Sequence, residues 1–137
     1  MADFKLLGGC QCGAVRYTIR APATETRHCH CSICRKTYGA LFVTFSTFPL
    51  AAFSLDKGAD ELVNYDTPKD HRKFCRTCGA HVMEVADDEP ERVYVPAGTI
   101  DGGAHPGHPE GAIKHIFVGS KVPWYEITDG LPQHEEF

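Results

Sequence analysis

The chain lacks an excess of basic residues, long apolar runs and clear helical periodicity. Its 137 residues carry 14 Lys and Arg against 18 Asp and Glu, which gives a formal net charge of −4. Such a chain does not neutralise the phosphates of nucleic acid or of anionic lipid, so we expect neither nucleic acid nor a membrane as a partner. The hydrophobic share of 42% is ordinary for a globular protein and excludes wholesale disorder.

One uncharged stretch, residues 37–55, approaches the length of a transmembrane helix. Hydroxyl side chains, Gly39 and Pro49 interrupt it, and Leu41, Val43 and Phe45 alternate with the period of a strand. We therefore interpret it as containing a buried strand. The first residues lack the apolar region and cleavage site of a secretory signal, which predicts a cytoplasmic protein.

The length predicts a single domain over residues 1–137. Short segments with strand character are separated by Gly and Pro turns, at residues 14–20, 40–47, 61–66, 81–86, 92–96 and 115–118. The best helix candidate follows Ser32, covers residues 33–38 and is stopped by Gly39. Many short strands joined by turns cannot supply the helical crossovers that parallel strands need, so we predict a mainly β fold with mostly antiparallel sheets and little helix.

Seven cysteines are many for a short chain, and an odd number cannot all form disulfides within it. In a reducing cytosol, clustered thiols are more often metal ligands or catalysts. They form three groups: Cys10 and Cys12; Cys29, Cys31 and Cys34; Cys75 and Cys78. Residues i and i+2 of an extended strand project from one face, which would place Cys10 beside Cys12 and Cys29 beside Cys31. Cys75 and Cys78, followed by Gly79, fit a zinc knuckle.

The grouping favours two metal sites. The two pairs, Cys10 with Cys12 and Cys75 with Cys78, supply the four thiolates of a closed structural zinc site. The triple then forms a second site with one open position, which is the catalytic type. Two alternatives remain: one group is buried free thiol, or the ligands hold an iron–sulfur cluster, for which the spacing gives no specific sign.

Several side chains near these groups are candidates for supporting roles. His28 and His30 flank the triple, where they would move a proton or orient ligands, or else face away as ordinary strand residues. Basic residues that could balance thiolate charge are Arg35, Lys36, Arg72, Lys73 and Arg76. His115 and Trp124 are candidates for the pocket lining, although core packing is the better interpretation of Trp124.

The motifs GGCQCG at residues 8–13, HCHCSICRK at 28–36 and FCRTCG at 74–79 resemble those of the glutathione-dependent formaldehyde-activating enzyme family, also called the centromere protein V type. Residues 97–99, 115–117 and 123–125 extend the likeness over most of the chain, which implies one zinc-binding domain of this type with a core of about residues 4–128. The resemblance implies a β-tent fold. It also implies a structural zinc on Cys10, Cys12, Cys75 and Cys78 and a catalytic zinc on Cys29, Cys31 and Cys34.

The activity implied by this resemblance is that of a carbon–sulfur lyase. It would join formaldehyde, or a related small aldehyde, to the thiol of glutathione to give S-(hydroxymethyl)glutathione, or catalyse the reverse. A thiol bound at an open zinc position is deprotonated and remains nucleophilic, so the chemistry suits a three-cysteine site. The alternative function is a non-catalytic, zinc-stabilised binding module on the same fold.

Overall fold

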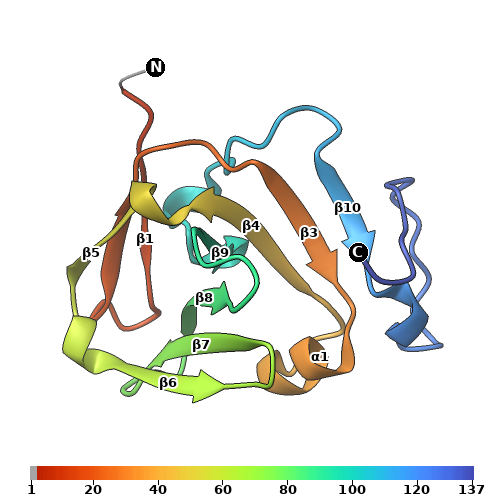
Figure 1. Cartoon of the computed structure of the whole chain (residues 1–137), viewed down its shortest axis with the longest axis horizontal. Coiled ribbons are helices and arrows are strands. Elements are labelled where there is room, and N and C mark those ends of the chain that lie inside the picture. The colour runs from red at the N-terminus through yellow and green to blue at the C-terminus, as the bar shows by residue number, and fades with distance from the viewer. Residues whose placement is uncertain (1–2) are drawn as a thin grey trace.

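The computed structural model describes residues 3–137, which form ten β-strands in two sheets and one α-helix (Figure 1). The smaller sheet has the strand order β1 (Leu6–Gly9), β2 (Arg16–Ile19), β5 (Phe53–Lys57). The larger sheet has the order β10 (Ile113–Ile116), β3 (Glu25–Cys29), β4 (Val43–Pro49), β9 (Arg92–Pro96), β8 (His81–Ala86), β7 (Asp70–Cys75), β6 (Leu62–Asp66).

Strand pairing follows the predicted mode with one exception. Every registered pair of strands is antiparallel except β10 with β3, which run parallel at one edge of the larger sheet. The prediction of a mainly β fold with mostly antiparallel sheets is confirmed. Within residues 3–137, no helix has the length and apolar content needed to cross a membrane.

The main core contains residues from both sheets. Val15, Tyr17 and Ile19 of the β2 region are fully buried and belong to one apolar cluster with Phe48. A glycine is required at position 8 of β1, because a Cβ there would lie 2.3 Å from the Tyr17 hydroxyl oxygen. This close contact holds β1 against β2, and the residues that follow β1 start from this fixed position.

The strand predictions were accurate where the sequence alternates, but four strands were missed. Residues 81–86 and 92–96 are β8 and β9 with the predicted bounds, and α1 (Ser32–Tyr38) ends at Gly39 in the left-handed conformation. Strands β1, β3, β5 and β7 were not predicted. Sequences such as ETRHC and DHRKFC carry too many charged residues to look like strands, and their pairing is decided by distant neighbours.

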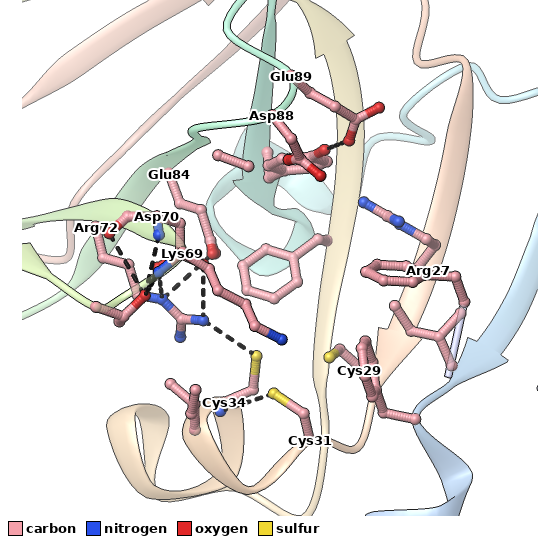
Figure 2. A pocket seen from close by; sticks show the side chains of 18 of the residues that line it. Arg27, Cys29, Cys31, Cys34, Lys69, Asp70, Arg72, Glu84, Asp88 and Glu89 are labelled. Carbon is pink, nitrogen blue, oxygen red and sulfur yellow. Dashed lines mark hydrogen bonds and ion pairs between the residues drawn. The ribbon is translucent and has the colours of Figure 1, made fainter. Parts of the chain in front are cut away.

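The larger sheet forms opposite walls of a pocket. A single registered pair, Glu84 with Tyr94, joins β8 to β9, whereas the other neighbouring strands pair over four or five residues. Strands β3 and β4 lie on one side of the pocket, β7 and β8 on the other, and α1 below (Figure 2). A second apolar cluster, which includes Cys29, Cys34 and Phe45, lies at this place.

The C-terminal segment differs from expectation. Trp124 is 74% exposed, so the interpretation as a core residue was wrong: the segment passes over the surface instead of entering the core. The predicted strand at 115–118 begins and ends earlier, because Phe117 has a left-handed φ of 56° that ends β10. Beyond it the chain returns alongside β10, where His115 forms a parallel bridge with Gln133.

Candidate metal centres and the adjoining pocket

Four cysteines from two distant parts of the chain converge on one point. The Sγ atoms of Cys10, Cys12, Cys75 and Cys78 all lie within 4.8 Å of one another. Cys12 Sγ is 3.7 Å from Cys10 Sγ and 3.8 Å from Cys75 Sγ, and all seven cysteines of the chain are free thiols. A tetrahedral zinc ion with bonds of about 2.3 Å holds its sulfurs about 3.8 Å apart. The spacing therefore fits one metal ion bound by four thiolates.

Two tight turns present these sulfurs. Cys10 and Cys12 lie in a turn after β1, which corrects the expectation of an extended strand. In this turn the Val15 amide donates to Cys10 Sγ at 3.2 Å, and in the other turn the Thr77 amide donates to Cys75 Sγ at 3.4 Å. Amides directed at sulfur stabilise thiolates, and a backbone hydrogen bond from Ala80 lowers the pKa of Cys78 to about 6.

The second group is built on the junction of β3 and α1. Cys29 ends β3, Cys31 is the N-cap of α1, and Cys34 lies in its first turn. Cys31 Sγ accepts a hydrogen bond from the Cys34 amide at 3.2 Å. This N-cap hydrogen bond fixes the position of the Cys31 sulfur. The three Sγ atoms lie within 4.8 Å of one another, and no fourth His, Cys, Asp or Glu of residues 3–137 belongs to that group.

The three thiols perturb one another's ionisation. Interaction with the thiols of Cys29 and Cys34 lowers the pKa of Cys31, whereas interaction with those of Cys29 and Cys31 raises the pKa of Cys34. Three thiolates this close repel one another, so all three ionise only when a cation lies among them. A metal that binds cysteine as thiolate supplies that cation, and the donor set fits one.

Arg72 is the basic residue that contacts this group. Its side chain is buried, and Nη2 lies 3.5 Å from Cys34 Sγ (Figure 2). Nε lies 3.1 Å from the Asp70 carboxylate and 3.3 Å from that of Glu84. Of the predicted basic candidates, Arg35 and Lys36 do not line the pocket and form no hydrogen bond with these sulfurs. The contact with Arg72 depends on the approach of β7 to α1.

The three sulfurs line a pocket of about 620 Å³, within the usual range for small-molecule sites. Apolar walls come from Phe45, Ile116 and Phe117. Lys69 extends over the cysteines and Arg27 rises on the opposite wall (Figure 2). Neither of these two cations was among the candidates predicted from the sequence. The alternation of Arg27 with Cys29 along β3 is the signal that could have indicated the first.

The two predicted histidines lie away from the pocket. Neither His28 nor His30 lines it. Alternation along β3 turns His28 to the face opposite Cys29, and His30, which follows the end of the strand, is buried beside His115. His28 Nδ1 is 2.8 Å from the Thr44 hydroxyl, and His30 Nε2 is 2.8 Å from Nδ1 of buried His115. His115 is also outside the pocket lining. Their hydrogen bonds connect strands and do not reach the sulfurs.

The buried carboxyl of Glu84 makes the stability of the fold depend on pH. Burial raises the pKa of its carboxyl from the ordinary value of 4.5 to about 8, although Arg72 opposes the shift. The folded state therefore binds this proton more tightly than the unfolded chain does. This contribution to stability is fully present below about pH 4.5 and is lost as the pH rises to about 8.

We expect Glu84→Gln to remove this dependence. Between pH 5 and pH 9 the melting temperature of the wild type should fall relative to that of Glu84→Gln, as measured by circular dichroism. Glu91→Gln, at an exposed carboxylate, is the control and should follow the wild type. Identical pH profiles for the wild type and Glu84→Gln would show that the carboxyl is ionised throughout.

Comparison with known proteins matches most of the chain to one family. A family profile described as glutathione-dependent formaldehyde-activating enzyme matches residues 5–120. A Halomonas elongata protein named as a candidate enzyme of this kind is 32% identical over 129 residues, 89% of this chain and 80% of its own length. A Phaeosphaeria nodorum protein named in the same way is 30% identical over 88 residues, 63% of this chain and 46% of its own length.

A solved structure gives the same result for the fold. A crystal structure of a Rhodobacter sphaeroides protein superposes with a TM-score of 0.58 at 27% identity. The match covers 70% of this chain and 88% of that one. The matched residues 5–120 contain both cysteine groups and most of the pocket lining. The chain therefore belongs to the glutathione-dependent formaldehyde-activating enzyme family.

Proposed function

We propose that this protein is a zinc-dependent carbon–sulfur lyase that joins formaldehyde, or a related small aldehyde, to the thiol of glutathione. The product is S-(hydroxymethyl)glutathione, and the reverse reaction uses the same site. The observation that carries the proposal is that the sulfurs of Cys29, Cys31 and Cys34 line the wall of a pocket large enough for a small peptide. A metal ion held by them would face the substrate.

The reaction is an addition and needs no oxidant. The sulfur of the thiol forms a bond to the carbonyl carbon, and the thiol proton passes to the carbonyl oxygen. Zinc bound by the three cysteines supplies one element of this chemistry, because coordination lowers the pKa of a substrate thiol and leaves its sulfur nucleophilic. The remaining tasks, which are binding and charge compensation, belong to the side chains around the pocket.

Arg72 compensates charge at the cysteine triple. Three thiolates exceed the charge of a divalent ion by one, and the guanidinium next to Cys34 Sγ offsets that excess in a buried place. Asp70 and Glu84 hold the guanidinium from the other side, so it does not turn away. Arg72 is thus a positioning residue for Cys34.

The charged residues above the sulfurs suit a zwitterionic peptide. Lys69 and Arg27 are available to bind carboxylates, and Asp88 at the rim is available to bind an ammonium group (Figure 2). Glutathione carries two carboxylates and one ammonium group in addition to its thiol. The apolar wall of Phe45 and Ile116 limits access of water to the reacting atoms.

The four-cysteine group has a different role in this proposal. Zinc on Cys10, Cys12, Cys75 and Cys78 would be structural, because four thiolates complete a tetrahedral site. It would fasten the turn after β1 to the turn after β7. Cys10 and Cys75 are buried in the main core cluster, so the site joins elements that the core brings together.

Exchange spectroscopy by NMR tests the activity directly. Formaldehyde and glutathione interconvert slowly with their adduct, and the zinc-loaded protein should accelerate that exchange in proportion to its concentration. The variant Cys31→Ser provides the matched control, because it removes one sulfur of the triple. Acceleration by both proteins alike would place the activity outside the triple.

The same measurement separates the lyase from the alternative function. A zinc-stabilised binding module would bind glutathione, or another ligand, without changing the exchange rate. No acceleration at any protein concentration, with zinc present at two equivalents per chain, would contradict the proposed reaction.

A further inference from the structure

A cluster of metal-ligating side chains lies on the face of the larger sheet opposite the pocket. His28, His115 and Asp129 each offer one ligand atom, and these atoms lie within 4.8 Å of one another. We propose that this cluster is a third metal site, which binds a divalent transition-metal ion through two histidines and one carboxylate. The proposal is independent of the lyase activity, because none of these residues lines the pocket.

Strand pairing places the two histidines side by side. In the parallel pairing of β10 with β3, His115 is registered opposite His28, whereas their neighbours Ile116 and Cys29 are registered together on the pocket face. Successive side chains of a strand point to opposite faces. The sheet thus separates the histidine cluster from the three cysteines and gives each its own side.

Each histidine has a partner for its second ring nitrogen. His28 Nδ1 lies 2.8 Å from the hydroxyl oxygen of Thr44, which is its registered neighbour on β4. His115 Nδ1 lies 2.8 Å from Nε2 of His30. Histidine ligands in metal sites almost always have such a hydrogen bond, which fixes the ring orientation and the tautomer. The rings are therefore held as they would be in a metal site.

The carboxylate comes from the C-terminal segment. Asp129 Oδ2 lies 2.8 Å from His115 Nε2, and the Asp129 side chain is 45% exposed, so an ion can reach the cluster from solvent. The next residues are held against β10, where the His134 amide donates to the His115 carbonyl at 3.0 Å. An ion at this cluster would fasten the C-terminal segment to the sheet.

The donor set selects the chemical class of the ion. Two imidazoles and one carboxylate suit zinc and other first-row transition metals, and three protein ligands leave room for water. Magnesium and calcium prefer sites made of oxygen ligands. A sulfur-free set also differs from the two cysteine groups, which gives the site a separate spectroscopic signature.

Cobalt titration of the untagged, full-length protein tests the site. The protein is first loaded with two equivalents of zinc, which occupy the cysteine groups, and Co²⁺ is then added at pH 7.5. We expect one further equivalent to bind with visible d–d absorption and without a thiolate-to-cobalt charge-transfer band. Calorimetry with Zn²⁺ under the same conditions should also give one further equivalent per chain.

Two variants and two controls identify the ligands. Asp129→Asn, at an exposed position, should weaken binding of the third metal equivalent at least about tenfold. His28→Ala, on a different element, should weaken it by a similar factor. Glu126→Gln in the same segment and His105→Ala, at exposed residues outside the cluster, should bind as the wild type does.

A second readout follows the C-terminal segment. In the wild type, the third equivalent should slow hydrogen exchange of the His134 amide, and in Asp129→Asn it should not. Absence of a third equivalent in the wild type would overturn the proposal and leave a hydrogen-bonded cluster only. Equal binding by Asp129→Asn and Glu126→Gln would overturn it as well, because the ion would then lie elsewhere.

Discussion

Cys75→Ser is expected to lose the folded state. Cys75 is fully buried in the main core cluster, and its sulfur belongs to the group of four that we propose to hold structural zinc. A structural zinc site contributes about 10 kcal/mol or more in small domains, against a total stability of about 5–15 kcal/mol. Loss of one ligand would therefore remove most or all of the stability.

Circular dichroism and gel filtration of Cys75→Ser measure this effect. We expect loss of the β spectrum, or aggregation, at temperatures where the wild type is folded. Thr77→Ser in the same turn leaves all four sulfurs in place and keeps the backbone amide that donates to Cys75 Sγ, so it is the matched control. A folded Cys75→Ser protein with the wild-type melting temperature would show that the four cysteines do not support the fold through a metal.

Cys31→Ser is expected to keep the fold and lose the activity. The side chain lies at the pocket, outside the main core cluster, and serine is itself a good N-cap for α1. With two of three sulfurs left, the metal of the triple should be lost or weakly held. The rate of adduct exchange should fall at least about 100-fold, which corresponds to about 2.7 kcal/mol of transition-state stabilisation.

Metal analysis of the same preparation completes this test. Cys31→Ser should retain the zinc of the four-cysteine group and the wild-type circular dichroism spectrum, with one equivalent of zinc fewer per chain. If Cys31→Ser unfolds in the same way as Cys75→Ser, the division of the cysteines into a structural four and a catalytic three is wrong. If it retains full activity, the triple is not the catalytic centre.

Local signals in the sequence predicted local structure well. The helix Ser32–Tyr38, which stops at Gly39, and the strands β8 and β9 follow from a stop residue and from alternation, which act within a few residues. The charged strands β3 and β7 could not be predicted in this way. Their backbones are ordered by pairing with β4 and β8, and three of their charged side chains, Arg27, Asp70 and Arg72, line the pocket.

The candidate site was partly predictable for the same reason. The compact spacing of Cys29, Cys31 and Cys34 limits how far apart their sulfurs can lie, so their grouping could be read from the sequence. The expectation that Arg35 and Lys36 balance the sulfur charge rested on proximity in the sequence. Arg72 contacts Cys34 instead, because β7 crosses near α1 in the folded chain.

By itself, the sequence determined the sets of cysteines and their order along the chain, because ligand type and short spacing are local properties. Tertiary structure decided which sets meet. It brings Cys12 to 3.8 Å from Cys75 across 63 positions, and it places His115 beside His28 through the register of β10 on β3. Such contacts depend on the packing of the two sheets and on strand pairing, and neither is encoded in any short segment.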